Sequence, residues 1–147
     1  MNKGLDLNII CCGVPADWVA DAINHWRKRI LSLAKIDLDF IGRNKNLENT
    51  LSKRISGKYA ISLTRDGKML SSPQWAKMLE DIAISPGSAT FLIGGADGLP
   101  DKIISQCNRK ISLAPITIQH DVALIVLLEQ LYRANAINAG LPYHRGE

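Results

Sequence analysis

The chain has 147 residues, of which 46% are hydrophobic and 22% charged, the composition of a globular protein long enough for one domain. Its three cysteines are too few for a disulfide framework or a zinc cluster, and no apolar run approaches the ~20 residues that cross a bilayer. We therefore expect a cytoplasmic protein with a single domain over residues 1–147, no metal site and no membrane segment.

The net charge of +4 is unevenly distributed. Residues 1–73 hold twelve lysines and arginines against seven acidic residues, whereas residues 74–147 hold six against seven. A basic surface attracts a polyanion such as RNA by counterion release, but most charge runs are ordinary solvated surface. Charge alone leaves both interpretations open.

Strand and helix patterns alternate from the amino terminus. A short apolar run predicts a strand over 7–12, and Pro15 is expected to open a helix whose apolar stripe continues to Leu33. The consecutive basic residues 27–29 would fall mainly on the exposed side of that helix. Alternating apolar and polar residues then predict a half-buried strand over 36–41.

The pattern continues through the middle of the chain. Residues 45–56 are polar with apolar positions at helical spacing, and 59–63 reads as a third strand. The polar segment 64–68 contains Asp-Gly, which is typical of a loop. Ser72 is expected to cap the next helix, with Pro73 at its first position.

A glycine-rich turn interrupts the second half. An apolar strand over 90–93 runs into the turn 94–98, and a short helix is expected over 100–107. Another short strand over 111–113 precedes a loop at 114–119.

The final helix is the most distinctive element. It is predicted over 121–139, with Gly140 as its stop, and its first half is apolar on every face. Such burial in a small domain suggests that a partner subunit covers part of the helix. The alternation of strands and helices predicts an α/β fold, a mainly parallel sheet with helices on both faces. Ligands of such sheets lie beyond the carboxyl ends of the strands.

Three segments carry side chains or turns suited to chemistry. The turn Gly94-Gly95-Ala96-Asp97-Gly98 is either an ordinary strand-to-helix turn or a close approach of backbone to ligand, and it lacks the Walker lysine. His120 is either a capping or packing residue or a general base. The tail Tyr143-His144-Arg145 is either a frayed end or a group that stacks on a base, titrates near neutrality and grips phosphate.

These segments together resemble one family. Residues 91–98, 117–120, 129–134 and 142–145 are similar to the RlmH (YbeA-like) methyltransferases of the SPOUT, or α/β-knot, superfamily. The resemblance spans nearly the whole chain, and the ordered set of motifs is more specific than any one of them.

The resemblance implies a fold and an activity that periodicity alone does not. It implies a trefoil knot near the carboxyl end, a homodimer, and S-adenosylmethionine (SAM) bound in the knot. It also implies methylation of N3 of a pseudouridine in the 23S ribosomal RNA of the assembled ribosome.

The resemblance further implies which residues form the site. Catalytic roles would fall to Tyr143, His144 and Arg145, across the dimer if the site is composite, with His120 as a competing base. Contacts to SAM, largely through the backbone, would come from Leu63, Gly94, Gly95, Ala114, Pro115, Ile116, Thr117, Ile118 and Gln119.

Three positions depart from the family pattern. Thr64 stands where Asp is usual, Gln119 where Pro or Ser is usual, and Leu124 where Arg is usual. Without that arginine, either substrate binding is weaker or Arg133 or Arg145 binds the substrate in its place. One alternative is a non-catalytic RNA- or ribosome-binding module on the same scaffold. Another is a nucleotide- or phosphate-binding enzyme that uses the turn at 94–98.

Overall fold

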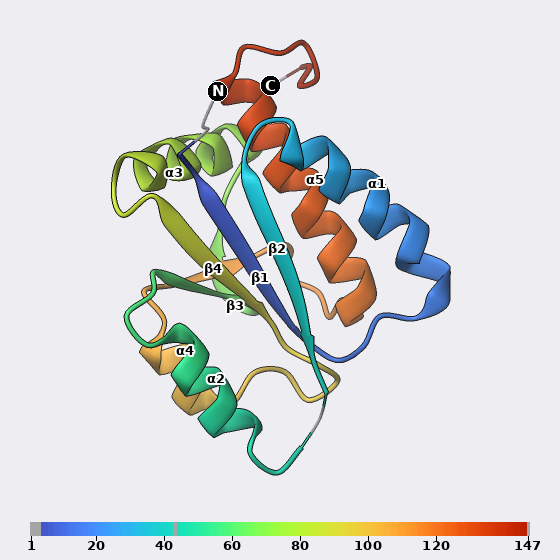
Figure 1. The fold of residues 1–147 in the computed structure, drawn as a ribbon, viewed down its shortest axis with the longest axis vertical. Coiled ribbons are helices and arrows are strands. Elements are labelled where there is room, and N and C mark those ends of the chain that lie inside the picture. The colour runs from blue at the N-terminus through green and yellow to red at the C-terminus, as the bar shows by residue number, and fades with distance from the viewer. Residues whose placement is uncertain (1–3, 43, 147) are drawn as a thin grey trace.

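A five-stranded parallel sheet forms the centre of the molecule (Figure 1). The computed structural model describes residues 4–42 and 44–146. The strand order is β2-β1-β4-β3-β5, and this confirms the predicted α/β class. The strands are β1 (Asp6–Cys12), β2 (Lys35–Ile41), β3 (Ala60–Met69), β4 (Ser88–Ile93) and β5 (Arg109–Ser112).

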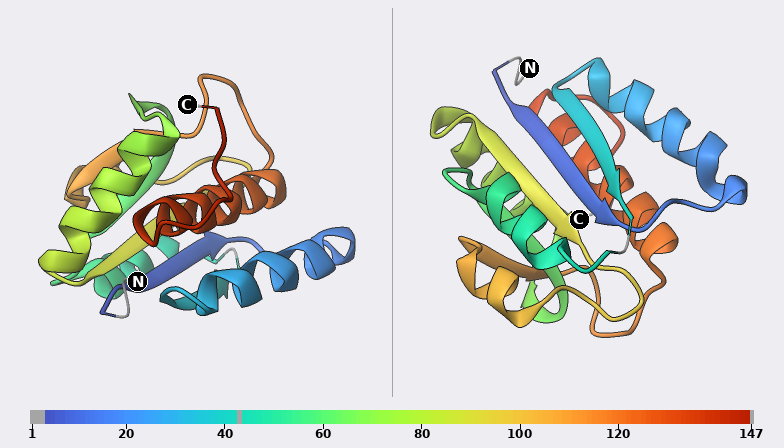
Figure 2. Two further views of the ribbon diagram at one scale, coloured as in Figure 1. Left: turned by 90° about the horizontal axis from the view of Figure 1, so that it is seen from above. Right: turned by 60° about the horizontal axis from the view of Figure 1, so that its bottom comes forward.

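Helices cover both faces of this sheet, as the alternating pattern predicts (Figure 2). On one face α1, α3 and α5 share the larger apolar core, with α5 packed against both neighbours. On the other face α2 and α4 share the smaller core. The helices are α1 (Ala20–Leu31), α2 (Leu47–Ile55), α3 (Ser72–Ile84), α4 (Asp101–Gln106) and α5 (His120–Asn138), with a short 3-10 helix η1 (Asp17–Val19) before α1.

The continuous apolar run of β1 is explained by these two cores. Alternate side chains point to opposite faces of a strand. Ile9 and Cys11 therefore enter the larger core, whereas Ile10 and Cys12 enter the smaller one. A strand buried on both faces has no polar side, which is why its sequence does not alternate.

Two helix starts differ from the sequence-based expectation. The segment after Pro15 remains extended at Ala16, whose backbone N–H donates to Oδ2 of Asp121 at 3.3 Å, and helical structure begins only at Asp17. This tertiary contact is invisible to local patterns. The cap of α3 is Ser71 rather than Ser72, because Ser71 and Gln74 form a reciprocal capping box.

The predicted loop at 64–68 is wrong, because β3 continues through it to Met69. Ile111 of β5 pairs with Leu63 and again with Lys68, so the intervening residues pass around β5. Only glycine fits at position 67, since a Cβ there would lie 2.6 Å from the carbonyl carbon of Ile111. Two chain segments more than forty residues apart are therefore wrapped closely together.

The long helix α5 is less uniformly buried than its composition predicts. Leu124 and Leu128 are fully enclosed, but Val122 is 39% exposed and Ile125 is half-buried. Gly140 ends the helix with a φ of +73°, as expected for a glycine stop. No helix among the described residues is long and apolar enough to span a membrane.

Candidate functional site

Three loops meet at the carboxyl edge of the sheet. Because β4, β3 and β5 are neighbours, Leu63 of β3 pairs with Ile93, where β4 ends, and with Ile111, one residue before β5 ends. The structure thus brings together the predicted cofactor residues Leu63, Gly94, Gly95 and the loop 114–119. This is the edge where ligands of open parallel sheets bind.

The turn after β4 depends on close backbone contacts. A Cβ on Gly94 would lie 2.5 Å from the carbonyl carbon of Gly98, and one on Gly95 would lie 2.9 Å from the carbonyl oxygen of Cys12. Glycine is therefore required here by packing alone. A hollow of about 220 Å³ opens beside the turn, and its lining residues are Cys12, Leu47, Gly95, Asp97, Gly98, Leu99 and Pro100.

Side-chain hydrogen bonds tie the other two loops together. Arg65 Nη1 donates to Oγ1 of Thr117 at 3.0 Å. The hydroxyl of Ser112 lies within hydrogen-bond distance of the carbonyl oxygens of both Arg65 and Ala114, at 3.0 and 2.8 Å. These contacts hold the loop 114–119 beside the wrapped part of β3. Sequence reasoning did not identify Arg65 as a site residue, because its partner lies 52 positions away.

The loop 114–119 makes few backbone hydrogen bonds of its own. Within the described residues, the backbone groups of 115–118 make no hydrogen bond to other backbone groups. Ile116 is 61% exposed and offers an apolar surface to a flat ring. An apolar side chain beside backbone groups suits the adenosine part of SAM, a ligand that needs no phosphate cradle. Among the described residues, no three potential metal ligands gather at metal-binding distance.

His120 and Asp121 lie where α5 begins, next to the end of β1. Nε2 of His120 lies 3.2 Å from Oδ1 of Asp121, and the ring faces Gly13. Asp121 is 2% exposed. Burial, followed by the neighbouring Cys12 and Asp121, raises the pKa of the Cys11 thiol to about 12. Cys11 therefore stays protonated and is no nucleophile.

The carboxyl-terminal tail folds back along the far half of α5. The hydroxyl of Tyr143 donates to Oε2 of Glu129 at 2.7 Å, and Nη2 of Arg133 donates to the same oxygen at 2.7 Å. Nη1 of Arg133 lies 3.1 Å from Nδ1 of His144. Glu129 and Arg133 thus form an ion pair within α5, and this pair anchors the tail. Arg145 is exposed.

These contacts set the charge states of Glu129 and Tyr143. Burial alone would raise the pKa of Glu129, but hydrogen bonds from Arg133 and Tyr143 outweigh it and hold that pKa below its ordinary value. Burial and the hydrogen bond to Glu129 raise the pKa of Tyr143. The phenol is therefore a neutral donor to a carboxylate at physiological pH.

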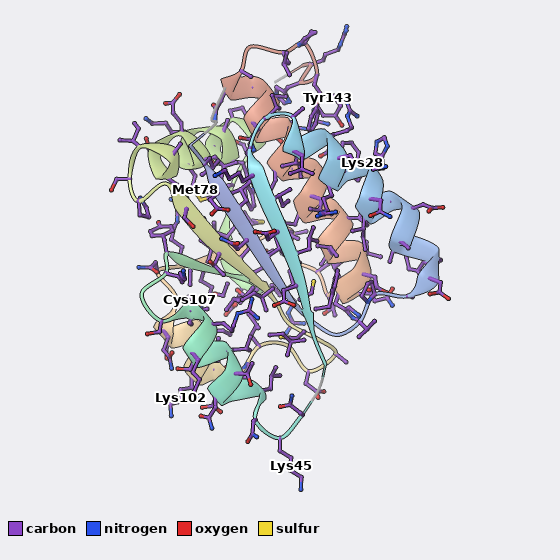
Figure 3. All side chains as sticks on the ribbon, in the orientation of Figure 1. Lys28, Lys45, Met78, Lys102, Cys107 and Tyr143 are labelled. Carbon is purple, nitrogen blue, oxygen red and sulfur yellow. The ribbon has the colours of Figure 1, made fainter. Side chains whose placement is uncertain are left out.

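Within one chain, the tail does not reach the three loops. Tyr143 contacts α5 nine residues beyond His120, about 14 Å along the helix axis. Figure 1 shows the tail beyond the end of α5 that is opposite to the 114–119 loop. Figure 3 places Tyr143 near the upper part of α1. The predicted catalytic and cofactor residues thus form two separate groups in a single chain.

Comparison with known proteins identifies the class. The family model described as "Predicted SPOUT methyltransferase" matches residues 5–144. A probable methyltransferase from Bordetella pertussis has the same fold, with a TM-score of 0.57 and 12% identity over 91% of this chain and 95% of that one. A putative methylase family protein from Neisseria gonorrhoeae has a TM-score of 0.59 and 8% identity over 98% and 88%. The chain is a member of the SPOUT methyltransferases.

Sequence relatives narrow the class further. The protein named "Ribosomal RNA large subunit methyltransferase H" from Dictyoglomus thermophilum is 34% identical over 95% of this chain and 99% of its own length. The protein of the same name from Synechococcus sp. is 35% identical over 93% and 94%. Within the SPOUT methyltransferases, the chain belongs to the family of these relatives.

Proposed function

We propose that this protein is a SAM-dependent methyltransferase that methylates N3 of a pseudouridine in the 23S ribosomal RNA of the assembled ribosome. The observation that carries the proposal is the meeting of the loops after β4 and β5 with residues 63–68 of β3 at one edge of a SPOUT sheet. The family relatives are named for large-subunit ribosomal RNA. Such a substrate places the activity in the cytoplasm, and residues 1–147 act as one SPOUT domain.

The loops would hold the donor through their backbone. Leu63, Gly95 and the 114–119 segment surround the place where the donor's adenosine would bind, and Ile116 packs on its ring. SAM supplies a methyl group already activated on a cationic sulfur, so positioning accounts for much of the acceleration. The hydrogen bond between Arg65 and Thr117 holds the 114–119 loop against β3.

The tail would supply the proton chemistry. The imide N3–H of pseudouridine must lose its proton as the new N–C bond forms and the S–C bond breaks. His144 takes that proton, and Arg145 stabilises the developing anion. Arg145 also suits the role of the absent family arginine, because Leu124 is buried in the core and Arg133 is engaged by Glu129.

The two groups of residues meet in a homodimer. A single chain keeps its tail away from its own loops, so the tail of one copy would complete the site of the other. The partly exposed apolar side chains Val122, Ile125 and Val126 on α5 would be covered in this dimer. The double pairing of Ile111 with β3 supports a trefoil knot near the carboxyl end, through which the final helix region would be threaded.

Titration of the purified protein with SAM by calorimetry tests the donor site. We expect saturable binding of one SAM per chain, abolished by Ile116→Asp, which places a charge on the exposed face of the loop. Lack of binding at millimolar SAM would contradict the proposal. RNA binding that persists without SAM binding would instead favour a non-catalytic ribosome-binding module.

A further inference from the structure

Arg29 occupies an aromatic cage that the methyl-transfer chemistry does not use. We define the cage as Trp26 of α1, Tyr132 of α5 and Tyr143 of the tail. The guanidinium carbon of Arg29 lies 5.2, 4.3 and 5.1 Å from the centroids of these three rings. Its Nη2 also donates to the hydroxyl of Tyr132 at 3.3 Å. The guanidinium is therefore half-buried rather than on the exposed side of α1.

The rings of the cage also contact one another. Tyr132 and Tyr143 pack edge to face, with their ring centroids 4.9 Å apart. The ring centroid of Trp26 lies 5.9 Å from that of Tyr132 and 6.3 Å from that of Tyr143. Helix α1, helix α5 and the tail thus each place an aromatic ring against the guanidinium of Arg29. Such offset and edge-on ring contacts around a cation are mutually favourable.

The tail has few other restraints at this point. The backbone hydrogen bonds of the described tail residues end with Gly140 and Leu141, which donate to Ile137 and Ala136 at the end of α5. Beyond Leu141 the described tail is held by side chains: the cage on one side and the Glu129–Arg133 pair on the other. Tyr143 belongs to both attachments, and His144 follows it directly.

We propose that Arg29 is a positioning residue, which fixes Tyr143 against α1 and α5 so that His144 and Arg145 project from one defined place. The inference rests on the proposed function, in which the tail completes a methyl-transfer site. A lysine would not replace Arg29, because an ammonium group lacks the planar face that contacts three rings. Misplacement of a reacting group by about 1 Å can reduce turnover ~100-fold.

The test compares Arg29→Ala, Arg29→Lys and a control that also removes one positive charge from a helix. Lys77→Ala suits this purpose, because Lys77 is exposed on α3 and its ion-pair partners are Glu80 and Asp81 of the same helix. Methylation of ribosomes that lack the modification is measured together with SAM affinity, thermal stability and hydrogen–deuterium exchange of the tail amides.

We expect both Arg29 variants to lower kcat about 10- to 100-fold, with SAM affinity unchanged and faster exchange at Gly140 and Leu141, whose amides donate to the end of α5. Lys77→Ala should behave as the wild-type protein. Wild-type kcat in Arg29→Ala, or lower kcat with tail exchange unchanged, would overturn the positioning role. A wild-type protein that methylates no ribosome would overturn the proposed function itself, and the inference with it. Arg29→Lys retains the half-buried positive charge. It is the variant that tests the positioning role if Arg29→Ala fails to fold.

Discussion

At the scale of single residues, the general base and the contact between β3 and β5 can each be tested by one substitution. His144 and His120 are both candidates for the base, and the structure separates them. His120 lies next to the buried carboxylate of Asp121 at the start of α5, whereas His144 contacts Arg133 near the other end. Their separation makes it possible to change one without disturbing the other.

Replacing His144 with alanine should lower kcat about 100- to 10,000-fold, the range for loss of a general base. SAM affinity should remain unchanged, because in the proposed site the loops hold SAM and His144 acts on the proton of the acceptor base. Single-turnover methylation and calorimetry measure the two effects. Unchanged turnover in His144→Ala would remove this residue from the mechanism, and His120→Ala would then be the variant to assay.

Gly67 provides a stability test of the wrapped segment. In Gly67→Ala the new methyl group would lie 2.6 Å from the Ile111 carbonyl carbon, so β3 and β5 must separate. We expect the free energy of unfolding to fall by about 2 kcal/mol, a typical cost of overpacking. Gly42→Ala is the matched control, since a Cβ there would meet nothing within 4 Å beyond its chain neighbours. Equal denaturant midpoints for the two variants would contradict the close crossing.

At the scale of elements, the attachment of the tail to α5 should depend on pH. The pKa of Glu129 is held below its ordinary value of 4.5 by Arg133 and Tyr143, despite the opposing effect of burial. A carboxylate with a lowered pKa contributes stability above its unfolded-state pKa and loses it as the pH falls through the folded-state pKa.

Glu129→Gln should therefore be less stable than the wild-type protein at pH 7, and the difference should shrink as the pH falls below about 4.5. Thermal melting of both proteins between pH 7 and pH 3 measures this. A constant difference over the whole range would mean that the ionised carboxylate does not contribute through these bonds.

Local sequence patterns predict some of the helices and strands and miss others. Strand β1 and helix α5 followed from apolar runs and a glycine stop, because their signals lie within a few residues. The extension of β3 to Met69 did not, because its polar sequence resembles a turn and its pairing partner Ile111 lies far along the chain. The cage around Arg29 was missed for the same reason, since Arg29 and Tyr132 are 103 positions apart.

For the whole molecule, the central proposal is a site shared by two copies. The cofactor residues were predicted by resemblance, and the structure gathers them at one edge of the sheet. It leaves the tail residues at the far end of α5, where Tyr143 is bound to Glu129 of its own chain. Light scattering at micromolar concentration should therefore report a dimer; a monomer that retains full activity would contradict the shared site.

Mixed dimers test the sharing directly. His144→Ala lacks the base, and Ile116→Asp lacks the donor site, so each variant alone should be inactive. A mixed dimer has one site that combines an intact loop with an intact tail from the other copy, and mixing after dissociation should restore activity. Continued inactivity would show that each tail serves its own chain.

The most direct test of the account is transfer of a labelled methyl group from SAM to assembled ribosomes that lack the modification. We expect stoichiometric incorporation into the large-subunit ribosomal RNA, at N3 of a pseudouridine, with ribosomes as a better substrate than free RNA. Ribosomes that bind the protein but gain no methyl group would contradict it and would identify the chain as a binding module.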